Sequence, residues 1–261
     1  MEENNEVTNA ENESTAEQLT VTDAMIGVIA SPGETFETMG ATKRKNYWLL
    51  PVILTIVVSL VVTFIFFRDE QLISGMMDKQ KAALEKNMEE QVKKGKMTED
   101  QAKIAIEQAE SFMDPKGTFF QVMGYGSVVI IPFAMLIVLS LVYLIITKIM
   151  KTNIDFGNLM NIVGLPMLIG AIGSVVALIL SVVMGRMTSV SLALFLTDET
   201  VGARLSELLM KIDLFSIWYY IAVAIGLMKM GNLSAGKAYG AVFGVWVFWL
   251  AITTISSTIF G

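Results

Sequence analysis

Long runs of apolar residues, separated by shorter polar connections, dominate the chain. Five of these runs come close to the roughly 20 residues that an α-helix needs to cross the hydrocarbon core of a bilayer. They lie near 47–67, 118–148, 158–184, 214–230 and 235–260, and no charged residue stands in their interior. The pattern therefore predicts an all-α integral membrane protein that is a bundle of five transmembrane helices.

The first run shows why insertion into a membrane is favoured. Between Tyr47 and Phe67 it holds fifteen Leu, Ile, Val or Phe residues and only three Ser or Thr residues. Each of these apolar residues contributes about −0.3 to −0.6 kcal/mol to insertion, so together they outweigh the hydroxyl groups. The whole chain agrees, because 17% of its residues are charged, whereas about 25% is usual for a soluble domain.

The longest polar connection, 68–117, has the pattern of two amphipathic helices. A first apolar stripe is followed by Lys93-Lys94-Gly95, where cations and a glycine favour the end of a helix. Thr98 and Gln101 have the spacing of a capping box for a second helix, which Asp114-Pro115 should end. We expect an extramembrane helical hairpin between spans 1 and 2. It is either a spacer that packs on itself or an arm that docks a partner.

The N-terminal region divides into two parts. Residues 1–42 hold nine acidic side chains and no basic one, and 1–20 is predicted to be a disordered acidic tail, which either solubilises the chain or carries a docking motif. Residues 21–46 form an interfacial amphipathic segment, read either as two short helices on the membrane or as a partly ordered linker. Ser31-Pro32 should start the second helix, with Glu34 at the capping-box position.

A further amphipathic stripe precedes span 4. Thr197-Asp198-Glu199 can start a helix whose apolar residues run from Val201 to Ile212. We expect this helix to lie at the outer membrane interface.

Basic residues at the borders of the runs predict the orientation. With the N-terminus in the cytoplasm, the short cytoplasmic flanks hold seven Lys or Arg residues and the short outer flanks hold four. The seven are Lys43, Arg44, Lys45, Lys148, Lys151, Lys229 and Lys237, and the four are Arg68, Lys116, Arg186 and Lys211. We therefore expect a cytoplasmic N-terminus and a C-terminus outside. If the source is prokaryotic, we expect the membrane to be the plasma (inner) membrane.

The missing residue types narrow the function. The chain has no Cys and no His, which removes thiol catalysis, Ser-His nucleophile pairs and the usual soft metal ligands. No ionisable residue lies inside a span, so a proton-coupled pump is disfavoured. Asn158, Asn161, Ser174 and Ser181 could line an uncharged polar path, but hydrogen bonding between helices explains them better. We predict no enzyme activity, no metal and no cofactor.

Small residues and prolines inside the spans predict helix packing and kinks. Gly236, Gly240 and Gly244 recur on one face of span 5, and Gly170 and Gly173 lie in span 3. Such spacing lets two helices approach closely. Packing within the monomer is the favoured interpretation, and a seam with a partner or a second copy is the alternative. Pro132 and Pro166 predict kinks in spans 2 and 3.

Several of these residues also form a pattern that resembles the Yip domain family, the Ypt/Rab-interacting multi-pass membrane proteins, in its prokaryotic branch. The resemblance covers 24–67 and 118–258 and rests on a series of residues in order. They are Pro32, Phe36, Pro51, Pro166, Asp213, Phe215, Trp218 and Gly226. The resemblance implies a five-helix bundle with a cytoplasmic N-terminus, so that 47–261 forms a five-span Yip-like membrane domain. Eukaryotic members of the family associate with Rab GTPases and with one another.

The sequence therefore predicts a non-enzymatic multi-pass membrane scaffold or accessory protein. Its partners would be the lipid bilayer and another membrane protein or a second copy of itself, and we expect no nucleic acid. The alternative is a small transporter or channel for an uncharged or lipid-like solute. A water-lined cavity that reaches the midplane would favour transport, whereas a filled core beside an exposed groove of Gly236, Gly240 and Gly244 would favour partner binding.

Overall fold

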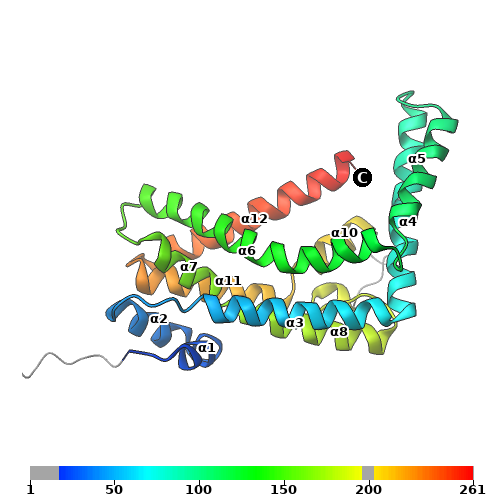
Figure 1. The fold of residues 1–261 in the computed structure, drawn as a ribbon. Coiled ribbons are helices and arrows are strands. Elements are labelled where there is room, and N and C mark those ends of the chain that lie inside the picture. Colours follow the sequence, from blue (N-terminus) through cyan, green and yellow to red (C-terminus); the bar gives the residue numbers. More distant parts are fainter. Residues whose placement is uncertain (1–17, 196–202, 261) are drawn as a thin grey trace, which may run out of the picture.

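The computed structural model describes residues 18–195 and 203–260, and all regular secondary structure in these ranges is helical (Figure 1). In chain order the elements are α1 Val21–Ala30, α2 Pro32–Ala41, α3 Leu49–Arg68, α4 Glu70–Lys93, α5 Glu99–Phe112, α6 Thr118–Ile149, α7 Phe156–Gly164, α8 Met167–Met184, the 3-10 helix η1 Leu192–Phe195, α10 Ala203–Met210, α11 Leu214–Met230 and α12 Ala235–Phe260.

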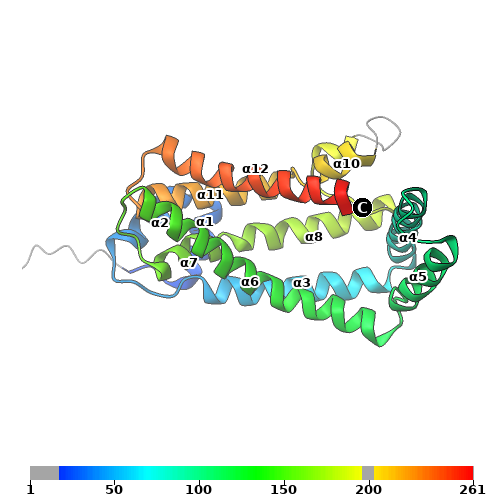
Figure 2. The same ribbon diagram turned by 90° about the horizontal axis from the view of Figure 1, so that it is seen from above.

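The long helices lie side by side along one axis. Figures 1 and 2 show α3, α6, α8, α11 and α12 running lengthwise, with α4 and α5 standing across one end of the bundle. The short helices α1, α2 and α7 lie toward the opposite end. We call these two ends the α4–α5 end and the α1–α2 end.

Four segments of the described chain are long and apolar enough to cross a membrane. They are Leu49–Arg68, Thr118–Ile149, Phe156–Met184 and Ala235–Thr254. Their surfaces are largely exposed and apolar, with Ile130, Val183 and Phe248 each more than 60% exposed. A surface of this size and character requires lipid rather than water around it. The protein is therefore an integral membrane protein, and α11, with 17 residues, falls just short of the same length.

The two intramembrane prolines have different effects. Pro166 separates α7 from α8, so the third apolar run is two helices joined at Leu165 and Pro166. This break agrees with the disruption of span 3 that was predicted at Pro166, because proline removes a helix hydrogen bond. Pro132, by contrast, lies inside α6, which continues on both sides of it.

The N-terminal segment forms two helices that share one connecting residue. Ser31 ends α1 by donating its N–H to the carbonyl of Gly27 at 2.7 Å, and it is also the N-cap of α2. Its side chain makes no capping hydrogen bond, so the expected capping box with Glu34 is wrong. The reason is that the end of α1 sets the Ser31 backbone at φ −143° and ψ 63°, away from the usual geometry of a helix N-cap.

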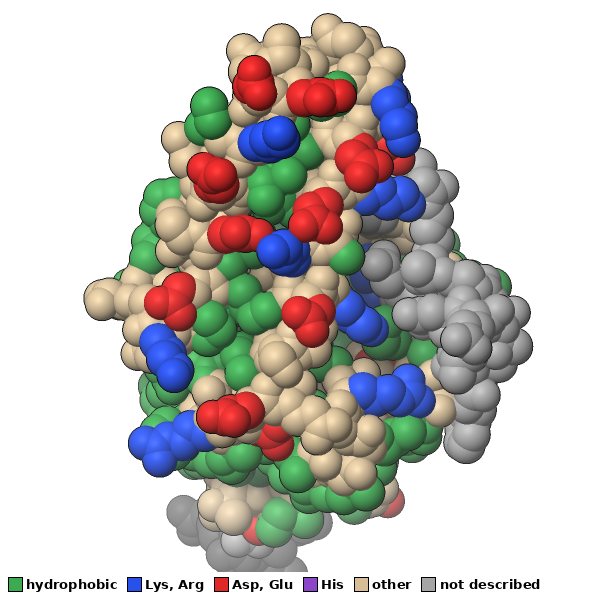
Figure 3. Space-filling view, turned by 90° about the vertical axis from the view of Figure 1, so that its right-hand side faces the viewer, with side chains coloured by type: hydrophobic (Ala, Val, Ile, Leu, Met, Phe, Trp, Pro, Cys, Tyr) green, Lys and Arg blue, Asp and Glu red, His purple; other side chains and the backbone are tan. Residues whose placement is uncertain are grey.

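The connection between α3 and α6 consists of α4 and α5. The predicted signals act where expected, because α4 ends at Lys93 and Thr98 forms a capping box with Gln101 at the start of α5. Lys81 and Glu110 form an ion pair of 2.7 Å between the two helices. Figure 3 shows acidic and basic side chains spread over this face of the molecule.

The main cluster of buried apolar side chains includes residues from the α1–α2 end. Phe36, Tyr47, Leu136, Tyr143 and Leu159 are among its largest fully buried side chains. These residues come from α2, α6, α7 and the segment before α3, so the N-terminal helices are part of the packed structure.

Two predictions fall partly outside the described residues. Most of the acidic tail, 1–17, lies outside them, and so do Thr197-Asp198-Glu199, which were expected to start the helix before span 4. The described part of that helix is α10, which ends at Met210.

Candidate functional site

Two residues of the family pattern, Phe36 and Gly226, come together where α2, α7 and α11 meet. Phe36 of α2 is fully buried, and a Cβ atom built on Gly226 of α11 would lie 3.2 Å from its ring and 2.9 Å from Ile162 of α7. Gly226 thus lets three helices approach closely, since any side chain there would collide with its neighbours. Beside this contact, Lys229 of α11 forms an ion pair with Glu37 of α2.

Asn161 joins α7 to the segment that enters α3. Its side chain is 1% exposed, and its Oδ1 accepts hydrogen bonds from the N–H groups of Tyr47 at 2.9 Å and Trp48 at 3.2 Å. Its Nδ2 donates to the carbonyl of Lys45 at 2.8 Å. Asn161 therefore serves an internal contact instead of a polar path. The sequence favoured a hydrogen-bonding role for Asn161, but it could not give the partners, because they lie more than a hundred residues away.

Asp155 caps α7 and ties it to the same N-terminal segment. Its Oδ1 accepts hydrogen bonds from Arg44 at 2.9 Å and from the Asn158 N–H at 3.1 Å. Burial by itself raises the pKa of the Asp155 carboxyl, but these hydrogen bonds and the Arg44 charge outweigh it, so its pKa lies below the usual value. The carboxylate is accordingly ionised at neutral pH.

Other residues of the pattern begin or pack the spans. Asp213 is the N-cap of α11, where its Oδ1 accepts from the N–H groups of Phe215 and Ser216 at 3.0 Å. The backbone of Gly173 in α8 approaches Phe215, with only 2.7 Å from a built Cβ to the Phe215 Cβ. The others are Pro51, buried in the first turn of α3, Trp218, half-buried against the core, Pro32, at the first position of α2, and Pro166, the N-cap of α8.

The glycine repeat of span 5 lies on the opposite side from its intramolecular contacts. Gly236, Gly240 and Gly244 of α12 are exposed, and a Cβ atom built on any of them meets nothing within 4 Å. We call these three residues the glycine face. The expectation that the repeat packs within the monomer is wrong, because α12 buries other residues, such as Ala238 and Val242. Gly170 is likewise exposed with nothing nearby, whereas Gly173 is packed.

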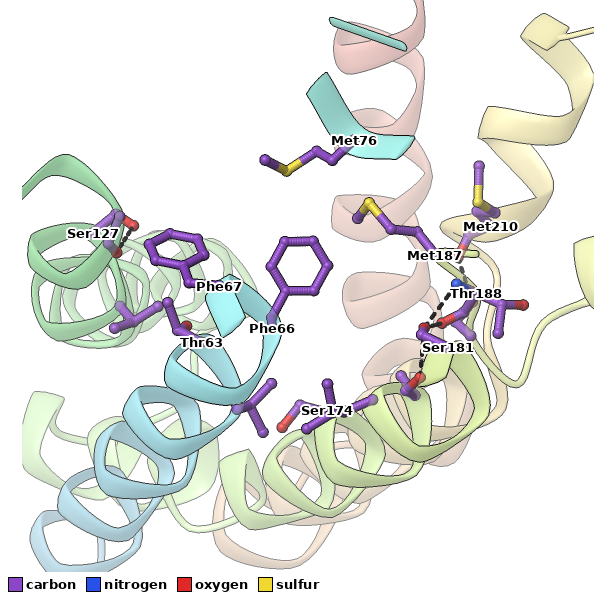
Figure 4. A pocket seen from close by; sticks show the side chains of 16 residues that line it. Thr63, Phe66, Phe67, Met76, Ser127, Ser174, Ser181, Met187, Thr188 and Met210 are labelled. Carbon is purple, nitrogen blue, oxygen red and sulfur yellow. Dashed lines mark hydrogen bonds between the residues drawn. The ribbon is translucent and has the colours of Figure 1, made fainter. Parts of the chain in front are cut away.

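An apolar cavity of about 540 Å³ lies toward the α4–α5 end, where α3, α6 and α8 diverge (Figure 4). Phe66 and Phe67 of α3 border it, as do Met187 and Thr188 after α8. Its described lining consists of apolar residues together with serines and threonines. We call it the apolar cavity.

The serines of the apolar cavity are engaged with nearby backbone. Ser127 donates to the carbonyl of Gly124 at 2.7 Å, Ser174 to Ala171 at 2.8 Å, and Ser181 to Ala177 at 2.7 Å. Such bonds within a helix satisfy the hydroxyl donors. The cavity therefore presents an apolar surface and suits a hydrocarbon chain better than water or an ion.

The described residues carry no arrangement for metal chemistry. No group of three or more Asp, Glu, His or Cys residues in 18–195 and 203–260 lies close enough to hold a metal ion. Two apolar features, the glycine face and the apolar cavity, are candidates for a function.

Comparison with known families gives a match over most of the chain. The model of the Yip1 domain matches residues 26–256. No curated protein and no solved structure gives a significant match. The matched range begins in α1 and ends in α12, so it includes both the α2–α7–α11 junction and all four candidate membrane spans. This integral membrane protein belongs to the Yip1 domain family.

Proposed function

We propose that the protein is a non-enzymatic membrane scaffold or accessory protein, which binds another membrane protein or a second copy of itself through the glycine face of α12. The observation that carries the proposal is the exposure of Gly236, Gly240 and Gly244, with nothing within 4 Å of a built Cβ. Within lipid, helices associate mainly through close packing, and small residues at four-residue spacing allow backbones to meet.

The packed core supports binding rather than transport. The interior toward the α1–α2 end is filled by large side chains, including Phe36, Tyr143 and Leu159. A continuous aqueous path needs polar groups along its length. Asn161 is the most deeply buried candidate for such a path, and its polar atoms form hydrogen bonds with the backbone of Lys45, Tyr47 and Trp48.

A five-span topology with a cytoplasmic N-terminus is part of the proposal. It is supported by α11, which runs lengthwise in the bundle and contacts α2, α7, α8 and α12. At 1.5 Å per residue, its 17 residues extend roughly 26 Å, near the lower limit for a span. The α4–α5 hairpin then lies outside the membrane on the outer side, and the α1–α2 end faces the cytoplasm.

The test of the scaffold proposal compares two Gly→Leu variants. Gly240→Leu should leave the stability of the monomer unchanged but abolish co-purification of a partner, or dimerisation, in mild detergent. The matched control is Gly126→Leu in α6, another position where a built Cβ meets nothing within 4 Å. Loss of the partner in both variants, or in neither, would contradict a specific role of the glycine face.

A second candidate function is the binding of a lipid-like molecule in the apolar cavity. It is favoured by the described lining, in which the serines donate to backbone carbonyls and no charged residue takes part. Ala177→Phe would fill part of this cavity, and Ile179→Phe, at an exposed position on the same helix, is the control. Fewer co-purified lipids per protein in the first variant alone would support the function. Equal lipid content would argue against it.

A further inference from the structure

A second cavity, of about 450 Å³, lies at the α1–α2 end of the bundle. It is formed by the connection from α6 to α7 and the connection from α11 to α12, which both lie at this end (Figures 1 and 2). Its lining is mostly polar, unlike that of the apolar cavity, and we call it the polar cavity. The lining residues are Met150, Lys151, Thr152, Asn153, Ile154, Asn158, Met230, Gly231, Asn232, Leu233, Ser234 and Lys237.

Lys151 occupies a backbone position that usually favours glycine. It follows α6 with φ 59°, in the left-handed region. Its N–H donates to the carbonyl of Lys148 at 3.0 Å, and the N–H of Thr152 donates to Thr147 at 3.0 Å. This pair of hydrogen bonds is the Schellman motif that often ends a helix.

Among the described residues the same motif occurs twice more, and there the left-handed residue is glycine. After α4 it is Gly95, with φ 68°, and after α8 it is Gly185, with φ 63°. A lysine at this position is less favourable than a glycine, because its Cβ crowds the backbone. The chain accepts this cost at the one of the three turns where the side chain lines the polar cavity. Asn232, on the other side of the cavity, also has a positive φ of 50°.

The charges of the polar cavity are those of an anion site. Lys151 approaches from the α6–α7 side and Lys237 from the first turn of α12, and no acidic residue is part of the described lining. Asp155 is near in sequence, but its carboxylate is held by Arg44 and Asn158. The amide of Asn153 and the hydroxyl of Ser234 can add neutral hydrogen-bond donors.

The surroundings indicate which anion fits. Ile154 and Leu233 give the polar cavity an apolar portion. The lining residue Met150 directly follows Ile149, which is 75% exposed and ends the candidate membrane span of α6. A phospholipid would place its phosphate between the lysines and its acyl chains along α6. We propose that the polar cavity binds the phosphate of an anionic phospholipid, held by Lys151 and Lys237. None of the three glycines of the glycine face belongs to the described lining, and the proposal goes beyond the scaffold function.

The experiment measures binding of short-chain phosphatidylglycerol and phosphatidylcholine to the purified full-length protein in detergent, by native mass spectrometry. Wild type should prefer phosphatidylglycerol. Because one basic residue near a membrane surface contributes about 1 kcal/mol, Lys151→Gly and Lys237→Gln should each weaken binding roughly fivefold, and the double variant roughly 25-fold. Lys148→Gln, which removes a lysine outside the lining, should bind as wild type.

The variant Lys151→Gly separates an effect on lipid binding from an effect on folding. Glycine suits the left-handed backbone, so this variant should melt no lower than wild type while it loses affinity for phosphatidylglycerol. Equal affinity for both lipids, or wild-type binding by the double variant, would overturn the proposal. If glycerol phosphate in solution binds as tightly as phosphatidylglycerol, the site takes a soluble phosphate ester and the lipid assignment is wrong.

Discussion

At the scale of single residues, Gly226 and Gly240 show how two glycines within apolar helices can have different surroundings. A side chain at Gly226 would meet Ile162 and Phe36, whereas a side chain at Gly240 would meet nothing within 4 Å. The first glycine is needed for the fold of the monomer, and the second is free for a contact outside it. Spacing alone could not separate the two roles, because it does not reveal which face of a helix its neighbours cover.

Gly226→Ala should therefore destabilise the protein. The added methyl group would overlap Ile162 at 2.9 Å and Phe36 at 3.2 Å, and such overpacking typically costs about 1–3 kcal/mol. Gly126→Ala, where the methyl group would meet nothing within 4 Å, should melt at or slightly above the wild-type temperature. Thermal unfolding of both variants in the same detergent measures the difference. A Gly226→Ala protein as stable as Gly126→Ala would show that the α2–α7–α11 junction can relax without cost.

Asp155 gives a prediction about pH. Its pKa is lowered in the folded protein, so its contribution to stability is complete above the unfolded value of about 3.9 and is lost as the pH falls through the folded pKa. Asp155→Ala removes the N-cap of α7 and should cost about 1 kcal/mol at neutral pH. Asp155→Asn keeps an N-cap and should cost less, since the ion pair with Arg44 is half exposed. In melting temperatures measured from pH 7 down to pH 3, the gap between wild type and Asp155→Ala should narrow as the pH falls below the unfolded value of about 3.9. A constant gap over that range would be the contrary result.

At the scale of elements, the sequence predicted which helices exist and where they end better than it predicted the contacts between them. The apolar runs correspond to α3, α6, α7 with α8, α11 and α12, within a few residues at each end. Helix boundaries follow from local signals such as Thr98 and Gly95, which act within one turn. The polar contacts that join elements, such as those of Asn161, depend on partners far along the chain and give no local signal. The left-handed Lys151 was equally hidden, because lysine is not typical of that conformation.

The α4–α5 hairpin should be removable without loss of the membrane part. Lys81 pairs with Glu110 across the two helices, and Met88 lies with Ile106 around the groove between them, so their contacts are largely mutual. Leu72 and Ile73, by contrast, are buried near the end of α3 and must be kept. Replacing 78–110 with a short Gly/Ser linker should leave the protein inserted and monodisperse, as measured by membrane fractionation and size exclusion.

The outcome of this deletion distinguishes the two roles proposed for the hairpin. Normal insertion with an unchanged partner supports a spacer, and normal insertion with a lost partner supports a docking arm. Failure to insert would contradict the prediction, since it would mean that the hairpin is part of the membrane bundle. A shorter deletion of 83–105 is the control for the length of the linker.

At the scale of the whole molecule, the natural absence of cysteine permits a clean test of topology. Single cysteines at Ala83, Arg186 and Ser234 fall at exposed positions on the two ends of the bundle. With the proposed orientation, an impermeant thiol reagent on intact cells should label positions 83 and 186 but not 234. Labelling after the cells are opened shows that the third cysteine is reactive. Labelling of 234 alone on intact cells would reverse the orientation.

The contact between α2 and α11 has a consequence for biosynthesis. The helix that receives Phe36 ends at Met230, so the ribosome must translate residues 42–230 before α2 can pack against the complete α11. At roughly 5–20 residues per second, this wait lasts on the order of ten seconds or more. During that time the apolar residues of α1 and α2 cannot pack against α11. The nearest apolar surroundings are at the interface of the membrane. We therefore expect α1 and α2 of the nascent chain to lie on the bilayer surface until α11 has been synthesised.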